Sequence, residues 1–150
     1  KDSMTWYANS AGRHGLSGAK GDAGEKLVEL YCKKNNLSWE DKNDYKSQVI
    51  DKIDCIIENE AIDVKTNIYM DRLAVELYLN NKKKVGPGWL VTTKAKKIYG
   101  VDLDNQKIYS YNVSDMIEYV DKNRYRSKLT KHGDEVIWVH KSESFITELQ

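Results

Sequence analysis

The sequence predicts a mixed α/β, or α+β, domain built around a central sheet. Three observations predict it: a helical apolar pattern near the start, a series of short apolar strand patterns, and a second helical pattern before a last strand. The chain has 150 residues, of which 40% are hydrophobic, which is enough for one core and too little for two. We therefore expect residues 1–150 to form a single domain.

The first predicted helix begins at Asp22 and ends near Asn35, because Leu27, Leu30 and Tyr31 recur on one helical face. Before it, the stretch 8–24 carries five glycines with basic residues between them and shows no apolar periodicity. Glycine-rich segments of this composition behave as flexible chains. Residues 1–20 are therefore predicted to form a flexible basic arm.

Short aliphatic and aromatic runs bounded by polar turns are typical of strands. Ser114 is a candidate N-cap for a second helix that ends near Val120 with Met116 on its inner face. Residues 20–101 would form the core of the domain, and residues 102–150 a C-terminal extension of strands and a helix. The predicted strands cover residues 37–39, 49–57, 61–66, 72–79, 97–101, 107–111 and 136–139.

Composition indicates the cellular compartment more clearly than it indicates the binding partner. The chain has 24 basic and 23 acidic residues, so a role with nucleic acid must be argued from where the charges lie. Cys32 and Cys55 lie inside apolar patterns, which suits reduced buried thiols better than a disulfide framework. No apolar run approaches a membrane span and no signal-peptide core is present, so we expect a cytoplasmic, intracellular protein.

Asp63 and Lys65 are two residues apart in a predicted strand, so their side chains share one face while Ile62 and Val64 take the other. Charged residues also alternate in this way on ordinary exposed hairpins, and Asp-x-Lys alone is weak evidence for a site. The evidence depends on which residue lies across from Asp63.

A two-residue loop at residues 58–59 would pair Ile57 with Glu60 and place Asp54 directly opposite Asp63. Directly opposed residues in an antiparallel pair share a face, with Cβ atoms roughly 4.5–5.5 Å apart. A loop of odd length would turn Asp54 to the opposite face and weaken the case.

Two facing carboxylates repel each other, so we expect a hard divalent cation to neutralise them. Mg²⁺ prefers one or two carboxylates together with water and phosphate oxygens, and Mn²⁺ is expected to substitute for it. Lys65 would then present a point charge to the phosphate, and the same register sets Lys52 opposite Lys65. This chemistry predicts metal-dependent hydrolysis of a phosphodiester bond.

The hairpin residues are also similar to a known motif. Asp54, eight intervening residues and then Asp63-x-Lys65 resemble the PD-(D/E)XK nuclease superfamily, which includes Holliday-junction resolvases and phage endonucleases. The resemblance covers roughly residues 20–101 and implies a restriction-endonuclease-like αβββαβ core whose central mixed sheet is flanked by helices. It implies an Mg²⁺-dependent DNA endonuclease, of a junction-specific or a site-specific phage or mobile-element type. Ile53, in place of proline before Asp54, is a common departure.

Glu25 has two explanations. Lys20-Gly21-x-x-x-Glu25 is similar to the resolvase pattern, which implies that Glu25 is a third metal ligand and catalytic residue beside the two aspartates. With Asp22 as N-cap, however, Glu25 would stand where a capping-box glutamate bonds back to the cap residue.

Basic residues outside the hairpin could neutralise DNA phosphates, although a solvated basic loop explains the stretch 122–132 equally well. Glu76 is expected to be a surface strand residue, and Trp89 and Tyr111 are expected in the core. Homodimerisation is expected because a duplex presents two strands to cut. The alternative function is a non-catalytic nucleic-acid-binding module, and a weaker one is an interaction domain with surface acids. The candidate DNA-binding residues are Arg13, Lys20, Lys52, Lys94, Lys96, Arg124, Arg126 and Lys128.

Overall fold

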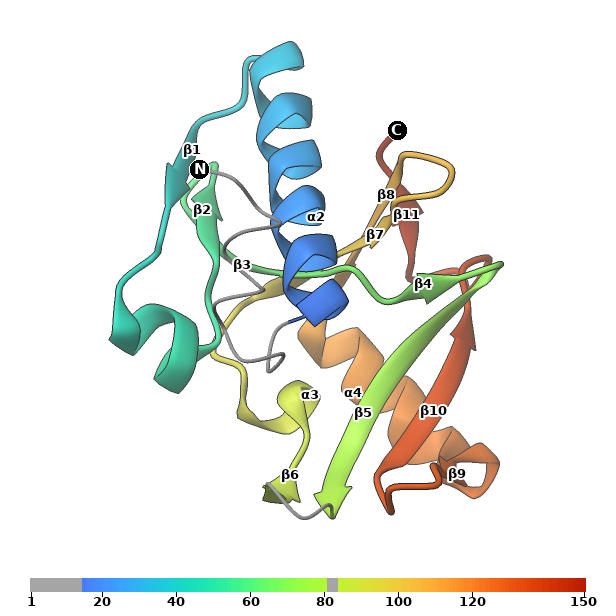
Figure 1. Ribbon diagram of the computed structural model, residues 1–150. Helices are drawn as coiled ribbons and strands as arrows, with labels where there is room; N and C mark the ends of the chain where they lie inside the picture. The colour runs from blue at the N-terminus through green and yellow to red at the C-terminus, as the bar shows by residue number, and fades with distance from the viewer. Residues whose placement is uncertain (1–14, 81–83) are drawn as a thin grey trace.

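Two β-sheets organise the residues described by the computed structural model, which are 15–80 and 84–150 (Figure 1). The larger sheet has the strand order β1 (Trp39–Asp41), β2 (Cys55–Ile57), β3 (Glu60–Lys65), β7 (Lys97–Asp102), β8 (Lys107–Asn112) and β11 (Thr147–Glu148). The smaller sheet has the order β4 (Ile68–Tyr69), β5 (Arg72–Asn80), β10 (Glu135–His140) and β9 (Lys128–Leu129), with β6 (Val85–Pro87) paired to β5.

The larger sheet is mixed, because β3 and β7 run parallel while its other neighbours pair antiparallel. The segment between β3 and β7 contains β4, β5, β6 and the short helix α3 (Trp89–Thr92). The predicted α+β class with a central mixed sheet is confirmed. The remaining helical elements are α2 (Gly15–Lys34), the π-helix η1 (Lys46–Asp51), α4 (Val113–Asn123) and the 3₁₀ turn η2 (Arg124–Arg126).

Helix α2 begins at Gly15, so the prediction of a helix start at Asp22 is wrong, and residues 15–20 are helical instead of forming an arm. Close packing accounts for one glycine of this helix, since a Cβ added to Gly24 would lie 2.1 Å from Oγ1 of Thr66, just beyond β3. Glycine lowers local helix propensity, but here it lets the helix approach the sheet, and tertiary packing outweighs the entropic cost. Arg13 lies outside the described residues.

Two glycines one turn apart in α2 are expected to respond oppositely to alanine. Gly21→Ala should stabilise the protein by about 0.5–1 kcal/mol, because nothing lies within 4 Å of its added Cβ and alanine favours helix. Gly24→Ala should destabilise it by about 1–2 kcal/mol, because Thr66 must move and lose its hydrogen bond to the Lys20 carbonyl oxygen. Urea unfolding of both variants measures the difference.

Removing the Thr66 hydroxyl in a Gly24→Ala/Thr66→Ala double variant should recover part of the loss, since the two residues are coupled by contact. Equal stability of the Gly21→Ala and Gly24→Ala variants would contradict this account of the helix contact.

The predicted strand over residues 49–57 is wrong in its first part. Residues 46–51 form the π-helix η1, in which Asp51 is buried with its carboxylate 2.7 Å from Nζ of Lys46 and 3.3 Å from Nζ of Lys94. Lys52 then takes a left-handed conformation with φ of 58°, and β2 begins only at Cys55. The ion pairs of Asp51 and the positive φ override the apolar pattern of Val49 and Ile50, which are exposed.

Two hydrophobic clusters cover the two faces of the larger sheet. The first lies under α2 and includes Val28, Cys32 and Ile62, and the second joins both sheets to α4 through residues such as Ile98 and Met116. In Figure 1, α2 stands against β2 and β3, while α4 lies behind β5 and β10. Both cysteines are free and buried, as predicted.

Helix α4 starts at Val113 with Asn112 as its N-cap, so Ser114 lies in the first turn and is not the predicted cap. The Asn112 side chain donates a hydrogen bond to Oδ2 of Asp115 at 3.3 Å, which ties the cap residue to the first turn. Among the helices in the described part of the chain, none has both the length and the apolar character needed to span a bilayer.

Candidate active site

The predicted hairpin register is confirmed. Strands β2 and β3 pair antiparallel with Ile57 opposite Glu60 and Cys55 opposite Ile62. Asp54 directly precedes β2, and its backbone N–H donates to the Ile62 carbonyl oxygen at 2.9 Å. The loop at residues 58–59 therefore has the length that brings Asp54 to the side of β3.

The Asp54 side chain attaches to β3 in place of a backbone ladder bond. Its Oδ2 accepts a hydrogen bond from the Val64 N–H at 2.7 Å. Val64 follows Asp63, and the negative charge of Asp54 raises the pKa of Asp63. Asp54 therefore lies close enough to Asp63 for its charge to act on that carboxyl.

Asp63 is a buried acid with an unsatisfied oxygen. Its side chain is 4% exposed, and its Oδ2 accepts no hydrogen bond from any described residue. Burial holds the pKa of Asp63 well above its usual range; Lys65 opposes this shift and Asp54 adds to it. An oxygen of this kind is costly to bury, and such groups in native structures commonly bind water or an ion or take part in chemistry.

Lys65 lies beside this acid. Its Nζ is 3.5 Å from Oδ2 of Asp63 and 5.1 Å from the centre of the Trp89 ring. Trp89 is buried, as predicted, and is the first residue of α3. The ammonium therefore lies close to both the unsatisfied oxygen and the indole ring, a cation–π contact.

Glu76 differs from the prediction of a surface residue. It is partly buried in β5, and burial raises its pKa while the charge of Lys65 lowers it. The side chains of Leu73, Val75 and Leu77 enter the core on the opposite face of the strand. Strand alternation indicated which face Glu76 takes, but only the packing of β5 near β3 brings it into the electrostatic range of Lys65.

Lys52 and Lys65 are neighbours without being a ladder pair. Lys52 lies before β2 and its Nζ donates to the Val49 carbonyl oxygen at 2.7 Å. Burial and the charges of Lys84 and Lys65 lower the pKa of Lys52, and Asp63 raises it. The site therefore has a second cation close to the acid, although the positive φ of Lys52 prevents strand pairing there.

Glu25 lies on α2, which covers the face of the sheet that carries Ile62. Burial raises the pKa of the Cys55 thiol, and the charges of Asp54 and Glu25 raise it further, so the two acids lie near one cysteine. In residues 15–80 and 84–150, however, no three His, Cys, Asp or Glu side chains form a group that could hold a metal ion. The structure does not bring Glu25 together with Asp54 and Asp63 in one such group. Of the two explanations of Glu25, the capping box is wrong, because the helix begins well before residue 22.

Tyr111 is a member of the site that sequence reasoning placed only in the core. Asp63 pairs with Ile98 and Ile98 pairs with Tyr111, so the three residues form one row across the sheet. The Tyr111 hydroxyl is buried without a hydrogen bond to any described residue, and burial and the charge of Asp63 raise its pKa well above the usual range. No sequence pattern links residues 63 and 111, because the parallel β3–β7 contact creates the row.

The candidate DNA-binding residues are distributed unevenly. Lys94 is ion-paired with Asp51, and the Arg124 guanidinium forms two hydrogen bonds with Glu135, so both cations have structural partners. Exposed cations include Lys96, Lys20 near the Tyr69 ring, and Arg126 and Lys128 in one groove with Arg72 and Trp138.

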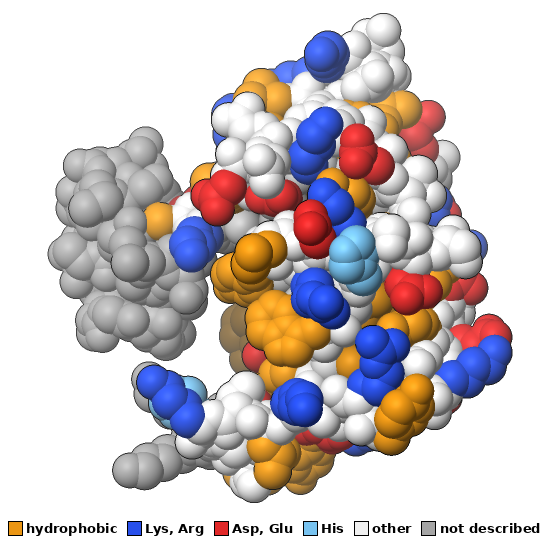
Figure 2. All heavy atoms as spheres, turned by 90° about the vertical axis from the view of Figure 1, so that its right-hand side faces the viewer, with side chains coloured by type: hydrophobic (Ala, Val, Ile, Leu, Met, Phe, Trp, Pro, Cys, Tyr) orange, Lys and Arg blue, Asp and Glu red, His pale blue; other side chains and the backbone are white. Residues whose placement is uncertain are grey.

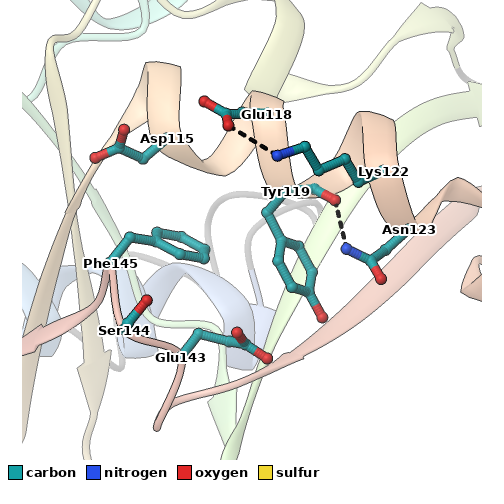
Figure 3. A pocket seen from close by; sticks show the side chains of 8 residues that line it. All are labelled: Asp115, Glu118, Tyr119, Lys122, Asn123, Glu143, Ser144 and Phe145. Carbon is teal, nitrogen blue, oxygen red and sulfur yellow. Dashed lines mark hydrogen bonds and ion pairs between the residues drawn. The ribbon is translucent and has the colours of Figure 1, made fainter.

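A different hollow lies between α4 and residues 143–145 (Figure 3). It holds about 490 Å³, and Figure 3 shows the Phe145 ring extending toward the Tyr119 ring, with 5.6 Å between the ring centroids. Its side chains include three acids, namely Asp115, Glu118 and Glu143, and one of them is paired with Lys122. An acid-rich hollow is a poor surface for a polyanion, and it lies apart from Asp63.

The two aspartates fit a hard divalent cation. Mg²⁺ needs only one or two protein carboxylates, since water and phosphate oxygens complete its shell. Asp63 offers a buried oxygen without a hydrogen bond from the described residues, and Asp54 offers a carboxylate held beside it. Mg²⁺ or Mn²⁺ bound there would neutralise both charges.

These features define a mixed α+β fold whose central hairpin carries a pair of acids and a lysine. Neither a protein-family model nor a curated protein sequence matches this chain. Among solved structures, the fold is similar to that of a bacterial homing endonuclease, I-Ssp6803I, with a TM-score of 0.50. The similarity covers 83% of this chain and 75% of the other at 12% sequence identity, a level at which it shows the fold alone. An endonuclease is thus built on the same fold.

Proposed function

We propose that this protein is a divalent-metal-dependent endonuclease that hydrolyses DNA phosphodiester bonds at Asp54, Asp63 and Lys65. The single observation that carries the proposal is the buried, unsatisfied Oδ2 of Asp63, with the Asp54 charge and the Lys65 ammonium beside it. A fold shared with a homing endonuclease supports the same class of reaction. The motif resemblance to the PD-(D/E)XK superfamily supports it from the sequence.

Each of the three residues has a separate task. Asp54 and Asp63 would hold Mg²⁺ or Mn²⁺, which when bound polarises the phosphate and lowers the pKa of water. The Lys65 ammonium would stabilise the negative charge that develops on the phosphate oxygens. The Trp89 ring lies 5.1 Å from the ammonium, and this cation–π contact would favour the same position of the charge before substrate arrives.

The proposal keeps Glu25 as a candidate for a third ligand or for a second metal, because its charge reaches Cys55 next to Asp54. We also propose that the enzyme acts as a homodimer, since cleavage of both strands needs two sites. We propose the cytoplasm as the place where it acts.

Plasmid cleavage with Mg²⁺, with Mn²⁺ and with a chelator tests the proposal. Wild type should nick or linearise the plasmid only with a metal, and Asp54→Asn should be slower by about 100-fold or more, because it loses a charged ligand. Asp104→Asn, an exposed acid on the turn before β8, is the matched control and should retain full activity. Metal-independent cleavage, or full activity of Asp54→Asn, would refute the site.

A non-catalytic nucleic-acid-binding module is the second candidate. It is favoured by one observation: the described residues contain no three-ligand group for a metal. In that case the protein would bind DNA with unchanged affinity in the chelator and would cut no substrate with either metal.

A further inference from the structure

A groove on the smaller sheet combines three cations with one aromatic ring. It is lined by Arg72 of β5, Arg126 of η2, Lys128 of β9 and Trp138 of β10, and it holds about 430 Å³. Figure 2 shows the side of the molecule that carries β10, where Lys and Arg side chains surround exposed hydrophobic ones. Pockets of this volume are large enough for a small organic ligand such as a nucleotide.

The cations of the groove are not neutralised locally. In the described part of the chain, no carboxylate lies within ion-pair distance of Arg72, Arg126 or Lys128. Asp71 feels the charge of Arg72 but is paired with Lys141 at 3.1 Å. Arg126 donates one hydrogen bond to the Tyr119 hydroxyl at 3.3 Å, which orients the guanidinium without cancelling its charge. Three uncompensated cations around one hollow favour an anion.

The ring of Trp138 is exposed and fixed at the same time. It is 41% exposed, and it forms a T-shaped pair with the Tyr69 ring, with a centroid distance of 5.9 Å and an interplanar angle of 68°. Its strand partner is the small residue Ala74, which leaves room beside the indole. A restrained, half-exposed aromatic ring among cations is the combination on which nucleic-acid bases stack.

The groove lies on the same strand face as Glu76 of the candidate site. Arg72, Ala74 and Glu76 alternate with buried Leu73 and Val75, so they point to one side of β5. Four residues of strand span about 13 Å, which corresponds to a few nucleotides at roughly 3.4 Å per base. A DNA strand held at Lys65 could therefore continue along β5 into the groove.

We propose that this groove binds an unpaired nucleotide of the DNA substrate, with its base stacked on Trp138 and its phosphates on Arg72, Arg126 and Lys128. A base inside a duplex is already stacked on its neighbours, so only a single-stranded or extruded base reaches the ring. The inference rests on the proposed function and names its substrate class, which is branched or partly single-stranded DNA.

Fluorescence anisotropy of labelled DNA tests the groove without cleavage if every variant also carries Asp63→Asn. One probe is a blunt duplex, and the other is the same duplex with a single-stranded extension. Trp138→Ala should weaken binding of the extended probe about 10-fold and leave the blunt probe unchanged, while Trp138→Phe should retain most of the affinity. Arg126→Ala and Lys128→Ala should each weaken binding and reduce the salt slope by about one.

Tyr45→Ala and Lys34→Ala are the matched controls, because both residues are exposed and lie outside the groove. Equal weakening of both probes by Trp138→Ala would overturn the proposal in favour of a duplex-backbone surface. Unchanged affinity, or tighter binding of an RNA strand of the same sequence, would overturn it as well. If Trp138→Ala has no effect on binding while wild type cuts plasmid, the groove proposal fails and the proposed function stands. If Trp138→Ala weakens binding of the extended probe but wild type cuts no plasmid, the proposed function fails and the groove proposal stands.

Discussion

Asp63→Asn is expected to lower DNA cleavage by about 1,000-fold while making the folded protein more stable. The loss follows from removal of the charge that would hold the metal. The gain follows from burial, because a desolvated carboxylate with an oxygen that accepts no hydrogen bond from the described residues costs about 1–3 kcal/mol. For a chain of this size we expect a rise in Tm of several degrees at pH 7.

The pH dependence of this gain has a defined sign. Since the pKa of Asp63 is raised in the folded state, the unfolded chain loses the proton more easily, and the carboxylate lowers stability above the unfolded pKa. Stability of the wild type should therefore rise as the pH falls through the folded pKa, and the advantage of Asn should vanish below about pH 4. Thermal unfolding of both proteins across this range measures the effect.

Metal binding adds a second readout for the same variant. Mg²⁺ bound to the native state alone should raise the Tm of wild type, and Asp63→Asn should lose that rise. Asp104→Asn should behave as wild type in both measurements. A destabilised Asp63→Asn protein that still responds to Mg²⁺ would contradict the assignment of Asp63 as the strained metal ligand.

Gly88→Ala is expected to destabilise the protein by about 3 kcal/mol and to reduce cleavage. A Cβ at Gly88 would lie 2.2 Å from the Glu76 carbonyl oxygen and 3.1 Å from its Cβ. Because the main obstacle is backbone, β5 and the start of α3 must separate, which is an overpacking cost at the upper end of the usual range. Trp89 is the first residue of α3, so this shift would release Lys65 from the ring.

Gly100→Ala is the control for the Gly88 variant. Gly100 is also buried, but its added Cβ would meet the side chains of Ile68, Asn67 and Leu73 at 3.4–3.5 Å, an ordinary contact distance. Urea unfolding should show little change for Gly100→Ala and a large loss for Gly88→Ala. Equal losses would mean that buried glycines in general, and not the contact with β5, limit stability.

The sequence by itself determined the hairpin and its register. Strand alternation separated Asp63 and Lys65 from Ile62, and the length of the loop determined the register that brings Asp54 across. These are local rules of backbone geometry. They hold because Asp63 and Lys65 lie in one strand, and because one short loop joins that strand to the segment of Asp54. The fold class followed for the same reason, since the order of helical and strand patterns restricts how the layers can pack.

Local rules failed where distant contacts compete with propensity. The glycines that indicated a flexible arm are helical from residue 15 onward, and one of them, Gly24, lets α2 approach Thr66 closely. Val49 and Ile50, which were predicted to begin a strand, lie in the π-helix η1, which the ion pairs of Asp51 with Lys46 and Lys94 stabilise. The local sequence alone does not indicate which residues make these contacts.

Only the tertiary structure decided what surrounds the acid pair. The parallel pairing of β3 with β7 places Tyr111 in the row of Asp63, and the packing of β5 brings Glu76 within range of Lys65. It also decided that Glu25 forms no three-acid group with the hairpin in the described residues and that Trp138 meets three cations. The physical reason is that long-range strand pairing and burial set these neighbours, whereas the sequence pattern specifies only which face of an element a residue takes.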